Sequence, residues 1–183
     1  HFEHSIDSLK KIKPGAVAKV LAYKNAEVKI LSPGLESVSL TQNASLYADT
    51  TVLIKEITPE LVGLNALKLS MQQQIKSGTT VKFSNKTAVK VLVAYFNQKD
   101  PKYLLPPVLE IDASANNYGQ AEIKISNALV LNGFPPANVH AYSFPAGTNT
   151  LTLAKGAGLV LGFIPDQQEL RIFNAGLDGR GKD

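Results

Sequence analysis

The segment KVLVAYFNQKDPKYLLPP, residues 90–107, changes character halfway along its length. In its first half, Val91, Val93 and Tyr95 alternate with three other apolar residues, so both faces of an extended chain are hydrophobic. This pattern is typical of a strand that is buried on both sides. The second half carries an amide pair, two lysines and an aspartate, and it ends at a proline pair. The sequence therefore predicts a central strand that delivers a polar loop to the rim of the fold.

Short β-prone runs continue on both sides of this strand, and turn residues separate them. Thr80–Phe83 is expected to pair with Ala88–Phe96 across a short connection, and a turn at Ser126-Asn127 precedes Leu129–Leu131. Without a convincing long helix, this order predicts an all-β fold, an antiparallel β-sandwich or jelly roll. The other expected strands are Ala16–Tyr23, Glu27–Leu31, Val38–Leu40, Thr51–Ile57, Leu67–Met71, Ala121–Ile125, Val139–Phe144, Thr150–Leu153, Gly158–Ile164 and an edge strand at Leu170–Phe173.

We expect one domain with one sandwich core. The sandwich is expected to span residues 16–173, after an N-terminal extension or linker remnant at 1–15 and before a mobile tail at 174–183. Alternating hydrophobicity selects the core residues. They are Leu69, Val81, Phe83, Val91, Val93, Leu129, Leu153, Leu161 and Phe163.

Composition narrows the classes of function. The 183 residues include no cysteine, which excludes disulfides, thiolate metal sites and thiol nucleophiles. Basic residues outnumber acidic ones by 19 to 15, but only two of them are arginines and most of the lysines are spread singly. Nucleic-acid binders cluster their charge and favour arginine, so no nucleic-acid partner is expected. No apolar run approaches the roughly 20 residues of a membrane span, so no membrane insertion is expected.

The chain begins at His1-Phe2, without a methionine. Such a start is typical of a mature fragment or a trimmed chain. We therefore expect that a signal peptide has been removed, and that the protein is periplasmic, on the cell surface or extracellular.

The polar loop after Phe96 combines the side chains that a sugar site needs. A sugar offers hydroxyls on its rim and C–H groups on its faces, so a site requires a ring beside amides, carboxylates or lysines. The candidate residues in this loop are Asn97, Lys99, Asp100, Lys102 and Tyr103. Tyr103 would supply the ring, and Asn97 and Lys102 the hydrogen bonds. The alternative is a solvated connection whose tyrosine packs on the edge of the core.

A second stretch, DASANNYGQ at residues 112–120, repeats the combination of amides and an aromatic ring. Its candidate residues are Asn116, Asn117 and Tyr118. The alternative is ordinary turn material, because Asn-Asn and Tyr-Gly pairs are common in turns.

No catalytic residues are expected. His140 is the only histidine away from the N-terminus, and it falls within an expected strand. Glycosidases need two carboxylates placed across a cleft. Glu110 and Asp112 would lie on the same face of an extended segment, too close to flank a bond, and they suit a cation better, although a solvated face is the usual explanation for such a pair.

Residues 50–164 resemble the galactose-binding-like jelly rolls that are appended to bacterial glycoside hydrolases. The resemblance lies in the order of three segments, ITPELVGLNALKLS, GTTVKFSNKTAVKVLVAYF and VHAYSFPAGTNTLTLAKGAGLVLGFI, of which the last is expected to close the fold with a hairpin. It implies a noncatalytic carbohydrate-binding domain of a bacterial glycan-utilisation protein, with an oligo- or polysaccharide as partner and no cofactor. Such domains often carry a structural calcium held by six to eight oxygens, for which Asp49, Glu110 and Asp112 are the candidates.

Two other classes of function stay open. A structural or protein-interaction β-sandwich without sugar binding is favoured by the absence of tryptophan, on which such modules often stack a sugar. An accessory or catalytic fragment of a glycoside hydrolase is disfavoured, because the histidine and carboxylate constellation is missing.

Overall fold

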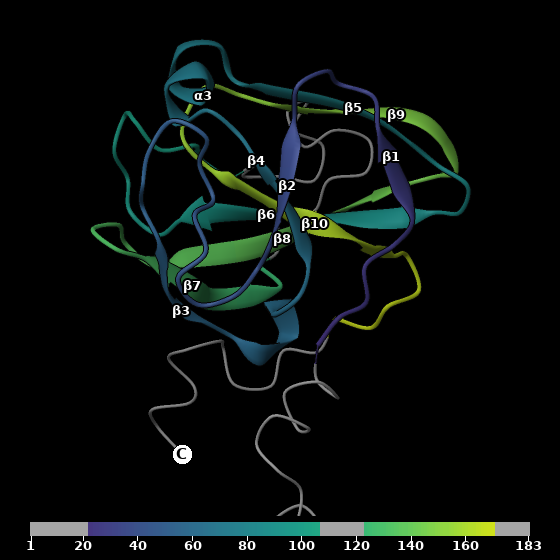
Figure 1. Cartoon of the computed structure of the whole chain (residues 1–183), viewed down its shortest axis with the longest axis horizontal. Coiled ribbons are helices and arrows are strands. Elements are labelled where there is room, and N and C mark those ends of the chain that lie inside the picture. Colours follow the sequence, from purple (N-terminus) through teal and green to yellow (C-terminus); the bar gives the residue numbers. More distant parts are fainter. Residues whose placement is uncertain (1–21, 107–122, 171–183) are drawn as a thin grey trace, which may run out of the picture.

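The computed structural model describes residues 22–106 and 123–170. This part of the chain is built almost entirely from short strands (Figure 1). The strands are β1 (Val28–Ile30), β2 (Glu36–Ser39), β3 (Ile54–Ile57), β4 (Asn65–Lys68), β5 (Thr79–Asn85), β6 (Val89–Phe96), β7 (Ile125–Leu131), β8 (Ala137–Phe144), β9 (Gly147–Leu153) and β10 (Leu159–Pro165). Between β3 and β5 lie a 3-10 helix η1 (Pro59–Leu61) and an α-helix α3 (Met71–Ser77).

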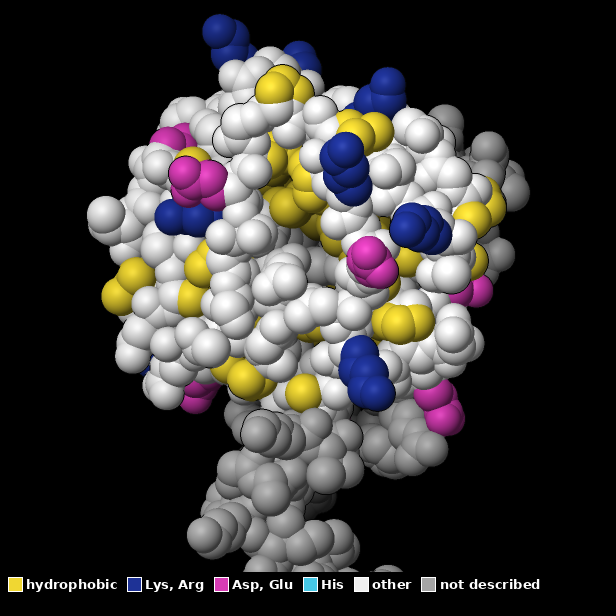
Figure 2. Space-filling model, turned by 45° about the vertical axis from the view of Figure 1, so that its right-hand side comes forward, with side chains coloured by type: hydrophobic (Ala, Val, Ile, Leu, Met, Phe, Trp, Pro, Cys, Tyr) yellow, Lys and Arg dark blue, Asp and Glu magenta, His cyan; other side chains and the backbone are white. Residues whose placement is uncertain are grey.

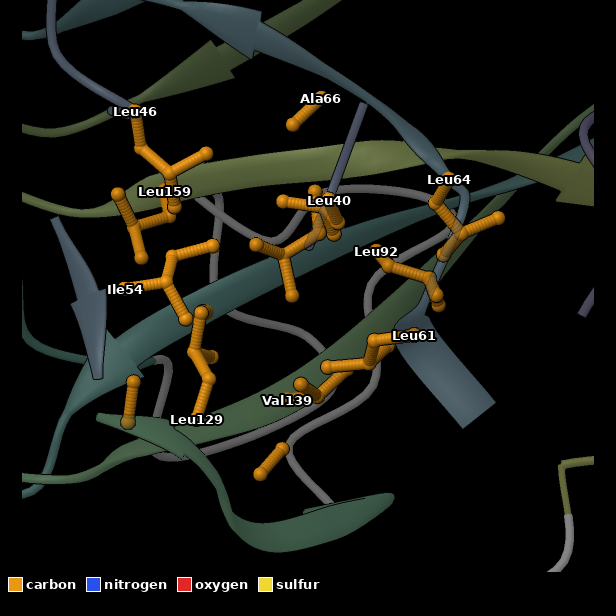
Figure 3. Packing of buried hydrophobic residues seen from close by; sticks show 14 of the residues in the cluster. Leu40, Leu46, Ile54, Leu61, Leu64, Ala66, Leu92, Leu129, Val139 and Leu159 are labelled. Carbon is orange, nitrogen blue, oxygen red and sulfur yellow. The ribbon is translucent and has the colours of Figure 1, made fainter. Parts of the chain in front are cut away.

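The strands form three antiparallel sheets. A five-stranded sheet with the order β10-β6-β8-β7-β3 lies in the middle, and the smaller sheets have the orders β1-β5-β9 and β2-β4. Side chains from β5 and β9 pack on one face of the middle sheet. Residues between 40 and 66 pack on the other face, in the cluster that Figure 3 shows. The described part of the chain is therefore an antiparallel β-sandwich, as the sequence predicts.

Strand β6 has apolar side chains on both of its faces. Val91 and Val93 point into the cluster beneath β5 and β9, whereas Leu92 and Ala94 point into the opposite cluster. All four are 0% exposed. The unbroken apolar run that opens the sequence analysis is thus explained, because the middle sheet has packing layers on both sides. Each of the nine predicted core residues is also buried.

The prediction that two pairs of strands, β5 with β6 and β9 with β10, form hairpins is wrong. The strands β5 and β6 follow one another directly, but β5 pairs with β1 and β9, while β6 pairs with β8 and β10. The connection at residues 86–88 thus crosses from one layer of the sandwich to the other. The chain crosses again between β9 and β10, so the closing segment is not a hairpin either. In a sandwich, a short connection can turn within one sheet or cross to the facing one.

Two local expectations also need correction. The strand expected at Leu67–Met71 ends at Lys68, and Met71 instead begins helix α3, whose N-cap Ser70 accepts a hydrogen bond from the Gln73 amide. The turn expected at Ser126-Asn127 is a bulge inside the single strand β7. There Asn127 has a φ of 46°, and its amide donates to the side chain of Asn138 on β8 at 2.7 Å.

The expected N-terminal extension and tail lie outside the described residues, as do most of the strands predicted at Ala16–Tyr23 and Leu170–Phe173 and the first two residues of the strand predicted at Ala121–Ile125. Their boundaries stay predictions. None of the helices in the described ranges has the length and apolarity of a transmembrane span.

Candidate functional site

The polar loop after β6 lies at one end of the sandwich, together with the connection between β7 and β8 and the turn between β9 and β10. At this end, on the left of Figure 1, the Asn97 amide donates to the Pro136 carbonyl at 2.7 Å. The Ala157 amide donates to the Lys102 carbonyl at 2.7 Å, and the Leu104 amide donates to the Ala157 carbonyl at 3.0 Å. Three connections from different strands are therefore joined into one rim.

Tyr103 lies inside the core rather than on the loop surface. Its side chain is 5% exposed, and its ring centroid lies 5.0 Å from that of Phe96 and 6.2 Å from that of Phe134. The ammonium group of Lys102 lies 5.1 Å from the centroid of the Tyr103 ring. The ring thus lacks the free face that sugar stacking requires, and the observed position matches the alternative of a tyrosine packed at the edge of the core.

Tyr47 packs against the aromatic group of Phe96, Tyr103 and Phe134 through its contact with Phe134. Its hydroxyl donates to the Gly158 carbonyl at 2.8 Å, and its ring lies 6.5 Å from that of Phe134. Burial, with smaller effects of Asp49 and Tyr103, raises the pKa of Tyr47. The hydroxyl is therefore a neutral structural donor and not a candidate base.

Two charged residues of the loop line an open depression. Lys99, Asp100 and Tyr103 from the loop line it, together with Lys155 from the turn before β10. Leu105, which is 60% exposed, adds an apolar surface. The structure thus brings three of the five candidate loop residues to one depression.

Asn97 belongs to the same rim, because its backbone amide donates to Pro136 in the connection that carries Phe134. The side-chain amide of Asn97 donates to the Asn127 side chain at 3.3 Å. Phe134 is partly exposed, whereas its aromatic neighbours Phe96 and Tyr103 are buried. Phe134 is therefore the aromatic residue of the rim that the sequence analysis missed. Its signal was the segment Asn132-Gly133-Phe134-Pro135-Pro136, which places a ring within a turn.

The second candidate stretch lies outside the described residues. This holds for Asn116, Asn117 and Tyr118, and for the carboxylates Glu110 and Asp112 as well.

Asp49, the remaining calcium candidate, caps helix α3. Its carboxylate accepts hydrogen bonds from the Ser70 hydroxyl at 2.8 Å and from the Met71 and Gln72 amides at 2.8 and 3.0 Å. Desolvation acts to raise its pKa, but the hydrogen bonds from Gln72, Met71 and Ser70 outweigh it and hold the pKa below its usual value. Within the described ranges, no three acidic or histidine side chains gather as a metal site. A structural calcium stays a prediction.

His140 lies on β8 and is 1% exposed. Its ring packs edge-on against Tyr95 at a centroid distance of 4.9 Å, and the Tyr95 hydroxyl is hydrogen-bonded to that of Tyr142. A substrate has no access to an imidazole at this depth. The only histidine among the described residues is therefore a packing residue beside Tyr95, on the side of the middle sheet that faces β5 and β9.

A second depression lies between β1 and the β2-β4 pair, at a distance from the rim. Its walls are Val28 and Ile30, and Leu67 and Phe163 lie at its floor. In Figure 2 this face shows hydrophobic side chains in the depth of a hollow. None of the residues that line it is charged. The two depressions differ in chemistry, and only the one at the rim presents charged groups.

Comparison with known proteins gives a match among the solved structures. No protein-family model matches the chain, and no curated protein matches it. A solved structure does match, with a TM-score of 0.78 and 37% sequence identity; it is described as a GH138 enzyme targeting pectin rhamnogalacturonan II. The match covers 86% of this chain but only 18% of that chain. The chain is therefore similar to one segment of a much longer enzyme that targets a glycan.

Proposed function

We propose that this chain is a noncatalytic carbohydrate-binding domain, galactose-binding-like in fold, of a bacterial glycan-utilisation protein. The observation that carries the proposal is the match at 37% identity over 86% of the chain, which accounts for 18% of an enzyme targeting pectin. A segment of that size suits an accessory domain beside a separate catalytic part. Its partner would be an oligo- or polysaccharide, and its place the periplasm, the cell surface or the exterior.

The contents of the fold support a binding role rather than a catalytic one. The single described histidine is buried, and the best-anchored carboxylate, Asp49, is used in a helix cap. What the rim offers is a partly exposed ring, side-chain amides and lysines. These groups hold a sugar through its C–H face and its hydroxyls without breaking a bond.

The test is glycan binding by the isolated chain. We would measure binding to pectic polysaccharides, including rhamnogalacturonan II, by affinity electrophoresis and calorimetry. Binding to cellulose and starch would be measured in the same way for comparison. Retarded migration in pectin, without release of reducing sugar on long incubation, is the expected result. Failure to bind any of these glycans would overturn the proposal, and release of reducing sugar would overturn its noncatalytic part.

The ring in the rim can be tested separately. Phe134→Leu removes the aromatic face but keeps apolar volume against Phe96 and Tyr103. We expect glycan affinity to fall about tenfold, within the range for truncating a binding anchor, while the fold is retained. The matched control is Phe144→Leu, because Phe144 packs with Phe83 in the cluster beneath β5 and β9, away from the rim. Equal binding by Phe134→Leu and Phe144→Leu would remove Phe134 from the site.

A structural or protein-interaction sandwich is the second candidate. The burial of Tyr103 favours it, because the loop then lacks the stacking ring that the sequence suggested. This function predicts that the isolated chain binds no glycan, and that removing it from a longer enzyme lowers the stability of the remainder.

A further inference from the structure

The lysines of the rim depression have no acidic partners within the described residues. Lys99 and Lys155 line the depression, and the ammonium group of Lys102 lies over the ring of Tyr103, another lining residue. The only ion pair formed within the described ranges joins Lys90 to Asp166. The one carboxylate in the lining belongs to Asp100, and it already accepts the Lys102 backbone amide at 3.0 Å. The depression therefore has excess positive charge.

The two lysine-bearing connections are held rigidly against one another. Backbone hydrogen bonds run in both directions between residues 102–104 and Ala157. At Gly156 the approach is so close that an added Cβ would lie 2.5 Å from the Leu104 amide nitrogen. The Gly156 amide also donates to the Gln74 carbonyl of α3 at 2.9 Å. The hydrogen bonds of Ala157 join the backbone close to Lys155 to residues 102–104, which begin three residues after Lys99. The two connections are thus held together before any ligand arrives, which lowers the entropic cost of binding.

The remaining lining is apolar. Leu105, Pro101 and Ala154 contribute carbon surface, and Leu105 is the most exposed large hydrophobic side chain that the structure describes. Lysines beside a carbon surface suit a ligand that has a negative charge and a C–H face on the same small unit. A uronic acid has both, since its ring carries a carboxylate in place of a hydroxymethyl group.

We propose that the depression between residues 99–105 and 154–155 binds a carboxylate-bearing sugar, with Lys99 and Lys155 contacting the carboxylate and Leu105 facing the ring. This inference deepens the proposed glycan binding and rests on it. It assigns the ligand to acidic glycans of the uronate class and assigns the selectivity to two named lysines. The apolar depression beside β1, which has no charged lining, is not expected to contribute.

The experiment compares one ligand in two charge states. Oligogalacturonides, and the same oligosaccharides after reduction of their carboxyl groups, would be titrated into the whole chain by calorimetry at low and moderate salt. The variants are Lys99→Gln, Lys155→Gln and the double variant. Lys86→Gln is the matched control, because Lys86 is exposed and lies in the turn before β6, at the opposite end of that strand.

We expect the acidic oligosaccharide to bind more tightly than its reduced form, and the difference to shrink as salt rises. Each single variant should lose about threefold in affinity and the double variant about tenfold, as for exposed ion pairs, while Lys86→Gln changes nothing. Equal loss in Lys86→Gln would overturn the site, because the effect would then follow net charge alone. Equal binding of charged and reduced forms, unaffected by the lysine variants, would overturn this inference and leave glycan binding intact. Binding of neither form, together with no binding to any pectic polysaccharide, would overturn both.

Discussion

Replacing Gly156 with alanine should disrupt the joint between the two rim connections. The new Cβ would lie 2.5 Å from the Leu104 amide nitrogen, 2.6 Å from the Leu104 Cα and 2.7 Å from the Tyr103 carbonyl carbon, all of them backbone atoms. The backbone of Gly156 also has a φ of +132°, which residues with a side chain rarely adopt. The backbone strain should cost about 1–3 kcal/mol. Overpacking adds a similar amount, so the free energy of unfolding should fall by roughly 2–6 kcal/mol.

A matched control separates strain from the steric clash. Gly34 has a φ of +77°, and an added Cβ there would meet nothing within 4 Å. Gly34→Ala should therefore lose only about 1–2 kcal/mol, the cost of the left-handed backbone. Urea unfolding followed by far-UV circular dichroism measures both losses, provided that the slopes of the two transitions agree. If the two alanine variants lose the same free energy, the close contact at Gly156 does not hold the rim together.

Three further predictions concern the core, the buried tyrosine and the helix cap. Val93→Asp should not fold, because it places an unpaired carboxylate where the native side chain is 0% exposed; a soluble variant with a cooperative melt would contradict this. Tyr103→Ala should lower the free energy of unfolding by about 3–5 kcal/mol, by leaving a cavity beside Phe96, and an unchanged melting temperature would show that the ring is not part of the core. Asp49→Asn should lose up to about 1 kcal/mol at neutral pH, because the charge at the start of α3 is exposed and screened. Folding lowers the pKa of Asp49, so this contribution is fully present above the pKa that Asp49 has in the unfolded chain and is lost as pH falls through its pKa in the folded protein. The unfolding curves of the two proteins should therefore converge below about pH 4. A gap that widens in acid would refute the assignment.

The strands of this fold could be predicted from the sequence because their hydrophobic alternation is local. Strand β5 alternates between buried and exposed positions, as a strand in an outer layer should, and β6 is buried on both faces, as a strand in the middle layer should be. The pairing of these strands could not be predicted. A short connection such as residues 86–88 has the same composition whether it turns within a sheet or crosses to the facing one. The choice depends on β1, β8, β9 and β10, which occupy the positions beside β5 and β6.

The candidate site was predicted in part for the same reason. The position of the polar loop follows from the end of β6, and Lys99 and Asp100 do lie at a depression there. The burial of Tyr103 depends on Phe134, a partner 31 positions further along the chain, so no local pattern reveals it. Lys155 joins the depression because the turn before β10 is hydrogen-bonded to residues 102–104, far from it in the sequence. Long-range pairing thus decided which polar residues became neighbours.

The burial of strand β6 on both faces limits how its sequence can change in evolution, because the middle sheet has no solvent-facing side along this strand. Seven of its eight residues are buried, and the remaining one, Lys90, is partly buried. Homologous domains can therefore diversify little along this strand, and changes in ligand preference should accumulate in the connections at its ends. Anyone redesigning the specificity of this domain should randomise residues 97–100 and 132–134 and keep the backbone contacts of residues 102–104 and Gly156 unchanged.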